Sequence, residues 1–249
     1  MNYLERETSV ANSARWQPAP EKPTILTIDN EIHVWLVNLD TMQFDPTILN
    51  EDEIKRANRM HFTVDQTRTR AARAILRTLL SYYLPQTAAS FVFQTTAQGK
   101  LFLPDDILKF NLAHTKQMAV YAFTLNHEVG VDLERQREKM DFTNVAKRFM
   151  GTTEYDYWSQ LTPEFQIELF FKIWARKEAL VKCTGEGLSG PLRELNSIDA
   201  HGELCQQIPY PTLTNVTLQL QDLPTINEFY GALAIDTTQP IKSYFYKLN

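Results

Sequence analysis

The sequence predicts an α+β fold made of two halves with a similar plan. Strand-like and helix-like segments follow one another twice along the 249 residues, in the order strand, helices, strands. The second round begins between residues 110 and 120. We therefore expect an N-terminal arm over residues 1–24, an N-terminal half over 25–115 and a C-terminal half over 116–249.

The N-terminal half begins after a polar, proline-containing stretch that we interpret as a loosely attached arm. The run Ile32–Val37 is β-branched and aromatic, which predicts a strand. Residues Ile54–Tyr83 contain no proline or glycine and are rich in Ala, Leu and Arg, so they predict a long helical stretch with a break near Phe62-Thr63. Pro85 ends that stretch.

The C-terminal half contains strands, helices and then strands again. Before it, Gly99-Lys100 predicts a turn, and the segments Met118–Leu125 and Val129–Leu133 predict two strands joined by a short turn at Asn126-His127. Residues from 191 onward are rich in Thr, Val and Tyr and predict further strands. Three helices are expected between these groups of strands, over residues 141–150, 152–160 and 164–183.

The composition is that of an ordinary soluble protein, with 43% hydrophobic and 22% charged residues. A net charge of −5 argues against a protein that coats nucleic acid or an anionic membrane. Two cysteines are too few for a disulfide framework or a zinc module, and no apolar run is long enough to cross a membrane. The first residues lack the pattern of a signal peptide. We expect a cytoplasmic protein.

The segment Val129–Glu134 alternates as a strand does. Its apolar residues fall on one face, whereas Asp132 and Glu134 fall on the other face together with Gly130. Two carboxylates about 7 Å apart at the Cα level repel each other. The simpler interpretation is a solvated edge, and the functional interpretation is a site for a hard cation such as Mg²⁺.

A second carboxylate pattern lies in the predicted helix Phe170–Lys182. At about 100° per residue, Glu178 falls within an apolar arc that includes Trp174, and Lys182 follows one turn later. A buried carboxylate is costly unless it is paired or bound to a metal. The alternative is an ordinary i,i+4 Glu–Lys pair at the surface, worth a few tenths of a kcal/mol.

Basic residues are concentrated between Lys55 and Arg77, where seven Lys and Arg side chains stand against the single acid Asp65. Such a run is either a solvated helix face or a patch for phosphates or an acidic partner. Lys100 in its predicted turn and His114 before a predicted strand are further candidate phosphate donors, although a lone histidine is more often structural.

Together these motifs resemble the 4′-phosphopantetheinyl transferase family, in its monomeric two-half, surfactin-synthetase-activating type. The segments Gly130–Glu134 and Trp174–Lys182 are the specific part of the resemblance. Similar segments, in matching order, are Asp65–Arg68, Gly99-Lys100, Asn111–Thr115, Lys147–Phe149, Thr153-Glu154 and Gly185–Ser189. The similarity covers roughly residues 30–245 and implies the family's fold, with the active site at the interface of the two halves.

The resemblance implies an enzyme that moves the phosphopantetheine arm of coenzyme A onto a serine of an apo carrier protein and releases 3′,5′-ADP. It implies Mg²⁺ as cofactor, with Asp132, Glu178 and Glu134 as its ligands. A base must take the serine proton, directly or through a water held by the metal. Glu178 is the first candidate for that base and Glu134 the second. Glu154 occupies the position of a functional glutamate in the family.

The resemblance also implies how coenzyme A is held. Lys177 and Lys182 would contact its phosphates, and His114 would bind the pyrophosphate. Arg68 and Lys100 would hold the nucleotide end, including the 3′-phosphate. The family often has a serine immediately before this histidine, where the present chain has alanine, so one hydroxyl contact to phosphate is absent.

The implied partners are acyl or peptidyl carrier proteins of fatty-acid, polyketide or peptide synthesis, with neither nucleic acid nor membrane involved. Such carriers are acidic, so the basic run would attract them. Two halves in one chain predict a monomer. The alternatives are another enzyme that uses coenzyme A, such as an acyltransferase with a His or Cys base, and a silent carrier-binding module, which would have lost a carboxylate or lysine from the two specific segments.

Overall fold

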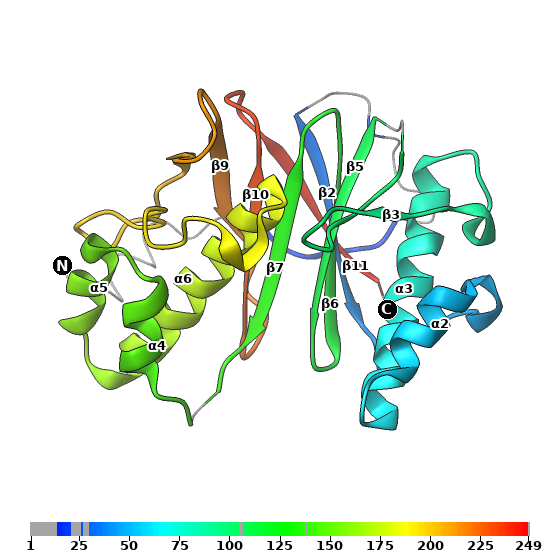
Figure 1. The fold of residues 1–249 in the computed structure, drawn as a ribbon, viewed down its shortest axis with the longest axis horizontal. Coiled ribbons are helices and arrows are strands. Elements are labelled where there is room, and N and C mark those ends of the chain that lie inside the picture. The colour runs from blue at the N-terminus through cyan, green and yellow to red at the C-terminus, as the bar shows by residue number, and fades with distance from the viewer. Residues whose placement is uncertain (1–13, 21–25, 27–29, 105–106, 138, 249) are drawn as a thin grey trace.

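Two β-sheets stand at the centre of the molecule, and helices cover the outer side of each (Figure 1). This computed structural model describes residues 14–20, 26, 30–104, 107–137 and 139–248. The α+β class predicted from the sequence is confirmed, because helices and largely antiparallel strands alternate along the chain. None of the described helices is both long enough and apolar enough to span a membrane.

The elements follow the predicted order closely. The helices are α2 (Glu51–Asn58), α3 (Thr63–Tyr83), α4 (Phe142–Phe149), α5 (Thr152–Ser159) and α6 (Pro163–Thr184), with short 3-10 helices η1 (Pro46–Ile48), η2 (Ala88–Ser90) and η3 (Gly187–Ser189). The strands are β1 (Gln17–Pro18), β2 (Glu31–Asn38), β3 (Gln94–Thr95), β4 (Leu101–Phe102), β5 (Leu108–Thr115), β6 (Met118–Leu125), β7 (Val129–Arg135), β8 (Gln207–Pro209), β9 (Thr217–Asp222), β10 (Phe229–Ile235) and β11 (Lys242–Leu248).

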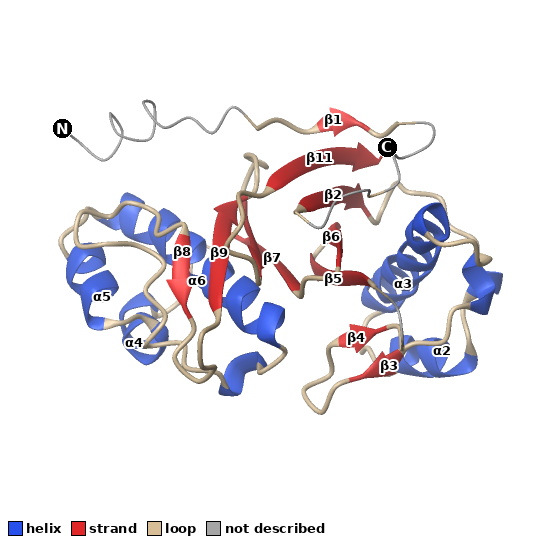
Figure 2. Ribbon diagram, turned by 90° about the horizontal axis from the view of Figure 1, so that it is seen from above, coloured by secondary structure: helices blue, strands red, loops and turns tan. Residues whose placement is uncertain are grey.

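The strands form two main sheets and one separate hairpin. The first sheet has the order β1-β11-β2-β6-β5, in which β11 runs parallel to both β1 and β2 and the other pairs are antiparallel. The second sheet is antiparallel throughout, with the order β7-β10-β9-β8. Strands β3 and β4 pair only with each other among the described residues, and Figure 2 shows them apart from both sheets.

Strand β2 is buried on both faces, which explains its continuous apolar run. Trp35 and Val37 pack into the core beneath α3, whereas Val34 packs on the opposite side against Val129 and Val131 of the second sheet. Burial of such side chains stabilises the fold by about 1.5–3 kcal/mol each. The layers are therefore α3, first sheet, second sheet and α6, so each half has a sheet with its own helix.

Local signals explain where the helices begin and end. Asn50 and Glu53 form a capping box at the start of α2. The predicted break appears between α2 and α3, where Phe62 has the extended conformation of an N-cap. Helix α6 starts with Pro163 in its first turn and ends at Gly185, whose φ of 79° is readily adopted by glycine.

Strand pairing divides the chain differently from the predicted boundary at 115/116. Strand β6 was placed in the C-terminal half, but it pairs with β2 and β5 of the first sheet, and β11 returns from the end of the chain to the same sheet. The predicted turn at Asn126-His127 therefore joins two different sheets. Register and partner choice depend on contacts between distant residues, which the order of segments does not contain.

The predicted arm is described only over residues 14–20 of its length. There β1 pairs with β11, and the indole of Trp16 packs against Phe245 with a centroid distance of 5.5 Å. Residues 1–13 and 21–24 lie outside the described part of the chain.

Candidate active site

Strand β7 and helix α6 lie directly against each other, and a glycine makes this possible. A Cβ atom on Gly130 would come within 2.1 Å of the backbone oxygen of Ala179 and 2.3 Å of the backbone nitrogen of Cys183. Only glycine permits so close an approach. The contact places Asp132 and Glu134, which share a face of the strand with Gly130, beside the C-terminal turns of α6.

Three carboxylates and one lysine meet between these two elements. Lys182 Nζ lies 2.5 Å from Asp132 Oδ1, while the buried Oδ2 atom of Asp132 has no hydrogen-bond partner in the described part of the chain. Glu178 forms no hydrogen bond with any described residue, although it interacts electrostatically with both Asp132 and Lys182. The alternative of a surface pair between Glu178 and Lys182 is not observed, because Lys182 pairs with the buried carboxylate of Asp132.

The electrostatics of the group show an excess of negative charge. Burial, and then the negative charge of Asp132, raise the pKa of Glu178, and the same two causes raise the pKa of Glu134 to about 7. Burial opposes the charge of Lys182, but the three carboxylates outweigh burial and raise its pKa. One lysine does not balance three carboxylates, so the group favours a further cation.

Trp174 holds Glu134 in place. Its indole Nε1 donates a hydrogen bond to Glu134 Oε1 at 3.1 Å, and its ring packs edge-on against Phe149 with centroids 4.8 Å apart. The second carboxylate oxygen, Oε2, lies 3.7 Å from an amino group of Arg137. Trp174 is predicted from the sequence only as part of an apolar arc, and the sequence gives no signal of this hydrogen bond.

A pocket of about 590 Å³ lies next to Glu178 and Lys182, between the two halves. Its lining residues come from α2, α3, the β3–β4 hairpin, β5 and the end of α6. Five of them carry basic side chains, namely Arg56, Arg73, Lys100, His114 and Lys182. The pocket walls desolvate the imidazole of His114, and this desolvation, together with the charges of Lys182 and Arg73, lowers its pKa. The pocket is therefore suited to a ligand with several negative charges.

Arg73 is the most deeply placed arginine of the pocket. Burial lowers the pKa of its guanidinium, and Glu53, 3.4 Å away, offsets this only in part. Its buried Nη1 atom has no hydrogen-bond partner among the described residues. An unpartnered buried guanidinium nitrogen at a pocket wall is a ready donor to an anion.

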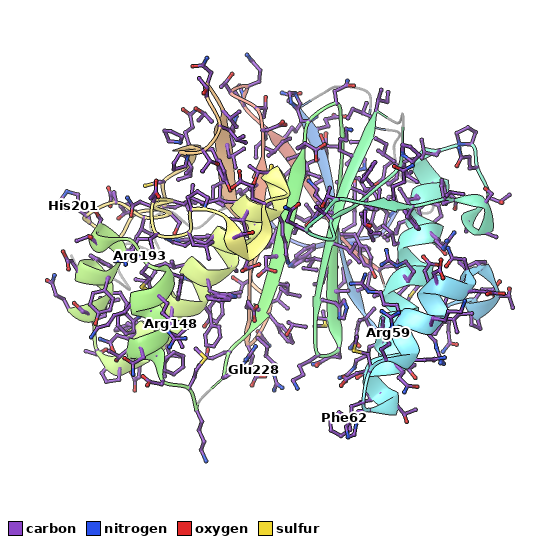
Figure 3. All side chains as sticks on the ribbon, in the orientation of Figure 1. Arg59, Phe62, Arg148, Arg193, His201 and Glu228 are labelled. Atoms are coloured by element: carbon purple, nitrogen blue, oxygen red, sulfur yellow. The ribbon has the colours of Figure 1, made fainter. Side chains whose placement is uncertain are left out.

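Most of the basic run does not reach the pocket. Figure 3 labels Arg59 and Phe62, which lie near α2 and the lower end of α3 in that view. Of the seven basic residues, Arg56 and Arg73 line the pocket and Arg59 is exposed. The other four contact side chains elsewhere: Lys55 with Glu51, Arg68 with Asp40, Arg70 with Asn58 and Arg77 with Glu53.

Comparison with known proteins agrees with this site. The family model of the 4′-phosphopantetheinyl transferase superfamily matches residues 128–232, the segment from β7 to β10. The 4′-phosphopantetheinyl transferase HetI of Nostoc sp. is 35% identical over 182 residues, which span 70% of this chain and 76% of HetI. The chain belongs to the 4′-phosphopantetheinyl transferase family.

Two further members of the family show the same relationship at lower coverage or identity. The transferase Sfp of Bacillus subtilis is 26% identical over 166 residues, 66% of this chain and 72% of Sfp. The transferase AcpT of Escherichia coli O157:H7 is 30% identical over 124 residues, 49% of this chain and 62% of AcpT. The resemblance inferred from the sequence, including the Sfp type, is confirmed.

Lys177 of this transferase does not lie in the pocket, contrary to expectation. Its side chain is only 1% exposed, and its ammonium lies 2.6 Å from Glu154 and donates hydrogen bonds to the backbone oxygens of Phe149 and Leu192 at 3.0 and 2.5 Å. Lys177 and Glu178 are neighbours on α6 and so point about 100° apart. The contacts of Lys177 in this structure are therefore structural, and none of them is with a residue that lines the pocket.

Glu154, the other member of this ion pair, is buried and accepts several hydrogen bonds. It is fully buried, accepts hydrogen bonds from the backbone nitrogens of Gly151 and Ser197 at 3.0 and 2.7 Å, and accepts one from the Ser197 hydroxyl at 2.9 Å. It thus connects α5 to the segment before β8. Through its ion pair with Lys177, the carboxylate also contacts α6 next to Glu178.

Arg68 is likewise placed outside the pocket. Its guanidinium forms two parallel hydrogen bonds with Asp40, at 2.8 and 2.6 Å, in the segment that follows β2. Thr69, Ala72 and Arg73 carry the face of α3 that lines the pocket. Arg73, and not Arg68, therefore faces the pocket in this structure, which depends on the orientation of α3 about its own axis and was not known from the sequence.

Lys100 and His114 both line the pocket, but only the side chain of Lys100 has hydrogen-bond partners among the described residues. The ammonium of Lys100 lies 2.6 Å from Glu128 and 2.8 Å from the backbone oxygen of Cys183. His114 forms no hydrogen bond with the described residues and faces the pocket from β5. The structure therefore places Lys100, His114 and Lys182 around one cavity.

The carboxylate group suits Mg²⁺ by its chemistry. Asp132, Glu134 and Glu178 supply the oxygen ligands that Mg²⁺ prefers, and the unpartnered Oδ2 of Asp132 is a free buried acceptor. Among the described residues, no three His, Cys, Asp or Glu side chains are yet close enough to enclose an ion. Lys182 forms an ion pair with Asp132 instead, so the binding of an ion requires the side chains of Lys182 and the carboxylates to move.

Proposed function

We propose that this chain transfers the 4′-phosphopantetheine arm of coenzyme A to a serine of an apo acyl or peptidyl carrier protein, with Mg²⁺, and releases 3′,5′-ADP. In this reaction the serine Oγ–P bond forms at the β-phosphorus, and the bond from that phosphorus to the bridging oxygen of ADP breaks. The observation that carries the proposal is the meeting of Asp132, Glu178 and Lys182 beside a cationic pocket, in a chain that belongs to this family.

The pocket residues bind and orient the nucleotide end of coenzyme A. Arg56, Arg73 and His114 stand on the wall formed by the N-terminal half, and Lys182 stands on the opposite wall. We assign the pyrophosphate to the space between His114 and Lys182. We assign the 3′-phosphate to Arg73, whose Nη1 lacks a partner, with Arg56 beside it. Positioning of this kind accounts for most of the catalysis in phosphoryl transfer.

The carboxylates hold the metal and move the proton. Asp132, Glu134 and Glu178 would hold Mg²⁺, which when bound neutralises charge on phosphoryl oxygens. Glu178 is our candidate for the general base, because it lines the pocket and has no hydrogen-bond partner among the described residues. Glu134 is the second candidate, although the indole of Trp174 already occupies one of its oxygens. The proton that leaves the serine hydroxyl would pass to a carboxylate oxygen of one of these residues.

The alternative of an acyltransferase with a cysteine nucleophile has weaker support. Burial raises the pKa of the Cys183 thiol well above its ordinary value, so this residue is a thiol at neutral pH. Cys183 also faces away from the pocket towards the backbone oxygen of Glu128, 3.2 Å from its Sγ atom. A silent carrier-binding module would have no use for Asp132, Glu178 and Lys182 together. The transferase proposal accounts for all three.

Intact mass spectrometry of a carrier protein tests the proposal. Apo acyl carrier protein is incubated with this protein, coenzyme A and Mg²⁺, beside a matched tube that contains EDTA. We expect a gain of one phosphopantetheine per carrier without EDTA and none with it. No gain on several apo carriers, by a protein that binds coenzyme A, would contradict the proposal. Both halves line one pocket within one chain, so we also propose a monomer, which sedimentation would check.

A further inference from the structure

The β3–β4 hairpin forms one wall of the pocket without belonging to either sheet. We call residues 94–102 the flap. Its turn is held by hydrogen bonds from the backbone nitrogen of Gly99 to the oxygen of Thr96 and from that of Thr96 to the oxygen of Lys100, both at 2.9 Å. Gly99 has a φ of 88°, as such a turn requires. Figure 1 and Figure 2 both show the tip of the flap directed towards the end of α6 and η3.

The ammonium of Lys100 fastens the flap to the other half of the molecule. It lies 2.6 Å from Glu128 Oε2 and donates a hydrogen bond to the backbone oxygen of Cys183 at 2.8 Å. Cys183 belongs to the last turn of α6, where a cation is favoured by the helix dipole. The Lys100 side chain is 10% exposed and that of Glu128 is 45% exposed, so the contact is shielded from water on the side of the lysine. Both of these contacts therefore join the flap to the C-terminal half of the chain.

The backbone of Glu128 has two contacts of its own with neighbouring segments. Its backbone oxygen accepts a hydrogen bond from the backbone nitrogen of Asp236 at 3.1 Å and contacts the thiol of Cys183 at 3.2 Å. It stands immediately before β7, whose next residues pack on α6. The backbone of Glu128 is thus fixed at the start of β7, and its carboxylate reaches from there to the flap.

We propose that Glu128 is a positioning residue for coenzyme A, which fixes Lys100 and with it the flap before the ligand arrives. This inference rests on the proposed function only for the identity of the ligand. Two of the three ammonium protons of Lys100 are engaged by Glu128 and Cys183, which leaves one for an anion in the pocket. Without Glu128, the flap and the lysine must be ordered at the expense of binding free energy.

The variant Glu128→Gln tests the proposal, because it keeps the size of the side chain and removes its charge. We expect the KM for coenzyme A to rise about five- to tenfold, as the loss of one partly shielded charge-assisted hydrogen bond would give. The kcat and the KM for the carrier protein should stay within about twofold, since no reacting atom is touched. An unchanged or lower KM for coenzyme A would overturn the proposal; a lower value would mean that Glu128 competes with the ligand for Lys100.

The matched control is Lys109→Gln. Lys109 on β5 is the other cation of Glu128, at 3.6 Å from Oε1, and it does not line the pocket. This variant also removes one ion pair of Glu128, so a general effect of lost charge would appear in both variants. We expect the KM of Lys109→Gln to equal that of the wild type. Equal increases in both variants would refute the specific role of the Glu128–Lys100 contact.

Hydrogen exchange provides a readout that needs no ligand and no activity. In Glu128→Gln, peptides that cover the flap should exchange faster than in the wild type, while peptides from β2 and β6 should not change. Equal exchange of the flap in the two proteins would overturn the proposal, whatever the kinetics show. If the wild type does not transfer phosphopantetheine, the proposed function fails, and the exchange result still decides whether Glu128 holds the flap. Thermal unfolding of each variant confirms that it is folded.

Discussion

The buried ion pair between Lys177 and Glu154 predicts that a change at Lys177 lowers the stability of the protein without weakening the binding of coenzyme A. Lys177 belongs to the segment that resembles the family's lysine–glutamate motif, yet within the described part of the chain its ammonium contacts Glu154 and the backbone oxygens of Phe149 and Leu192. Its side chain is 1% exposed and that of Glu154 is 0% exposed. The variant Lys177→Met removes the charge and keeps most of the volume.

The expected loss of stability follows from the partners that are left behind. Removal of one member of a buried ion pair costs about 3–5 kcal/mol, because the other charge stays buried without its partner. In Lys177→Met the carboxylate of Glu154 keeps its hydrogen bonds from Gly151 and Ser197, which favours the lower end of this range. For a chain of this length, about 3–5 kcal/mol corresponds to a decrease in Tm of roughly 6–20 °C.

Urea unfolding of a double-mutant cycle measures the pair itself. Lys177→Met, Glu154→Gln and the double variant are compared with the wild type. We expect the double variant to be less destabilised than the sum of the two single variants, because each single change leaves one buried charge alone. Calorimetry with coenzyme A, carried out well below each Tm, should give a dissociation constant for Lys177→Met within about threefold of the wild-type value.

Two results would refute this reasoning. Unfolding of Lys177→Met within 1 kcal/mol of the wild type would show that the buried pair does not stabilise the fold as its geometry requires. A loss of coenzyme A affinity greater than tenfold, in a variant that is fully folded at the temperature of the measurement, would show that Lys177 contacts the ligand after all.

Three further variants test the site. Gly130→Ala should destabilise the protein by at least about 3 kcal/mol in urea unfolding, because the added Cβ meets the backbone of α6 at 2.1 Å; a loss below 1 kcal/mol would contradict the close packing of β7 and α6. Arg68→Gln should leave the KM for coenzyme A within twofold, whereas Arg73→Gln should raise it about tenfold, and the reverse order would return Arg68 to the site. Lys182→Met should weaken coenzyme A binding more than carrier binding, and equal effects on both would contradict a phosphate contact.

The fold could be predicted in its elements but not in its pairing. The limits of α3 and α6 follow from local signals: Pro85 follows the end of α3, and α6 begins with Pro163 and ends at Gly185. The return of β11 to the first sheet leaves no local signal, because it depends on which exposed edge of β2 remains to be covered. Pairing between distant strands is decided by three-dimensional packing.

The site shows the same division between local and distant information. Asp132, Glu134, Glu178 and Lys182 could be predicted, because each lies in a short segment with a recognisable pattern, and the structure brings them together. Assignments to Arg68 and Lys177 depended on the direction of a side chain from its helix. A rotation of about 100° per residue separates a pocket residue from its neighbour on a helix, and only tertiary packing determines which one faces the pocket.

The structural roles of Trp174 and Glu128 were not predicted. Trp174 appears in the sequence as one of several apolar helix residues, and its hydrogen bond to Glu134 arises only because β7 crosses α6 at that level. Glu128 belongs to no recognisable motif, and its partner Lys100 lies 28 residues earlier in the chain. Such contacts carry no local pattern that a sequence displays.

The rate of phosphopantetheine transfer by Asp132→Asn tests the central claim most directly. This variant keeps the shape of the side chain and its contact with α6 but removes the charge that would hold Mg²⁺. The control is Asp40→Asn, which changes an exposed carboxylate whose partner, Arg68, lies outside the pocket. Intact mass spectrometry of the carrier at saturating Mg²⁺ should show transfer reduced at least about a hundredfold in folded Asp132→Asn and unchanged in Asp40→Asn. Transfer by Asp132→Asn within a few-fold of the wild-type rate would contradict the assignment of the reaction to this group of carboxylates.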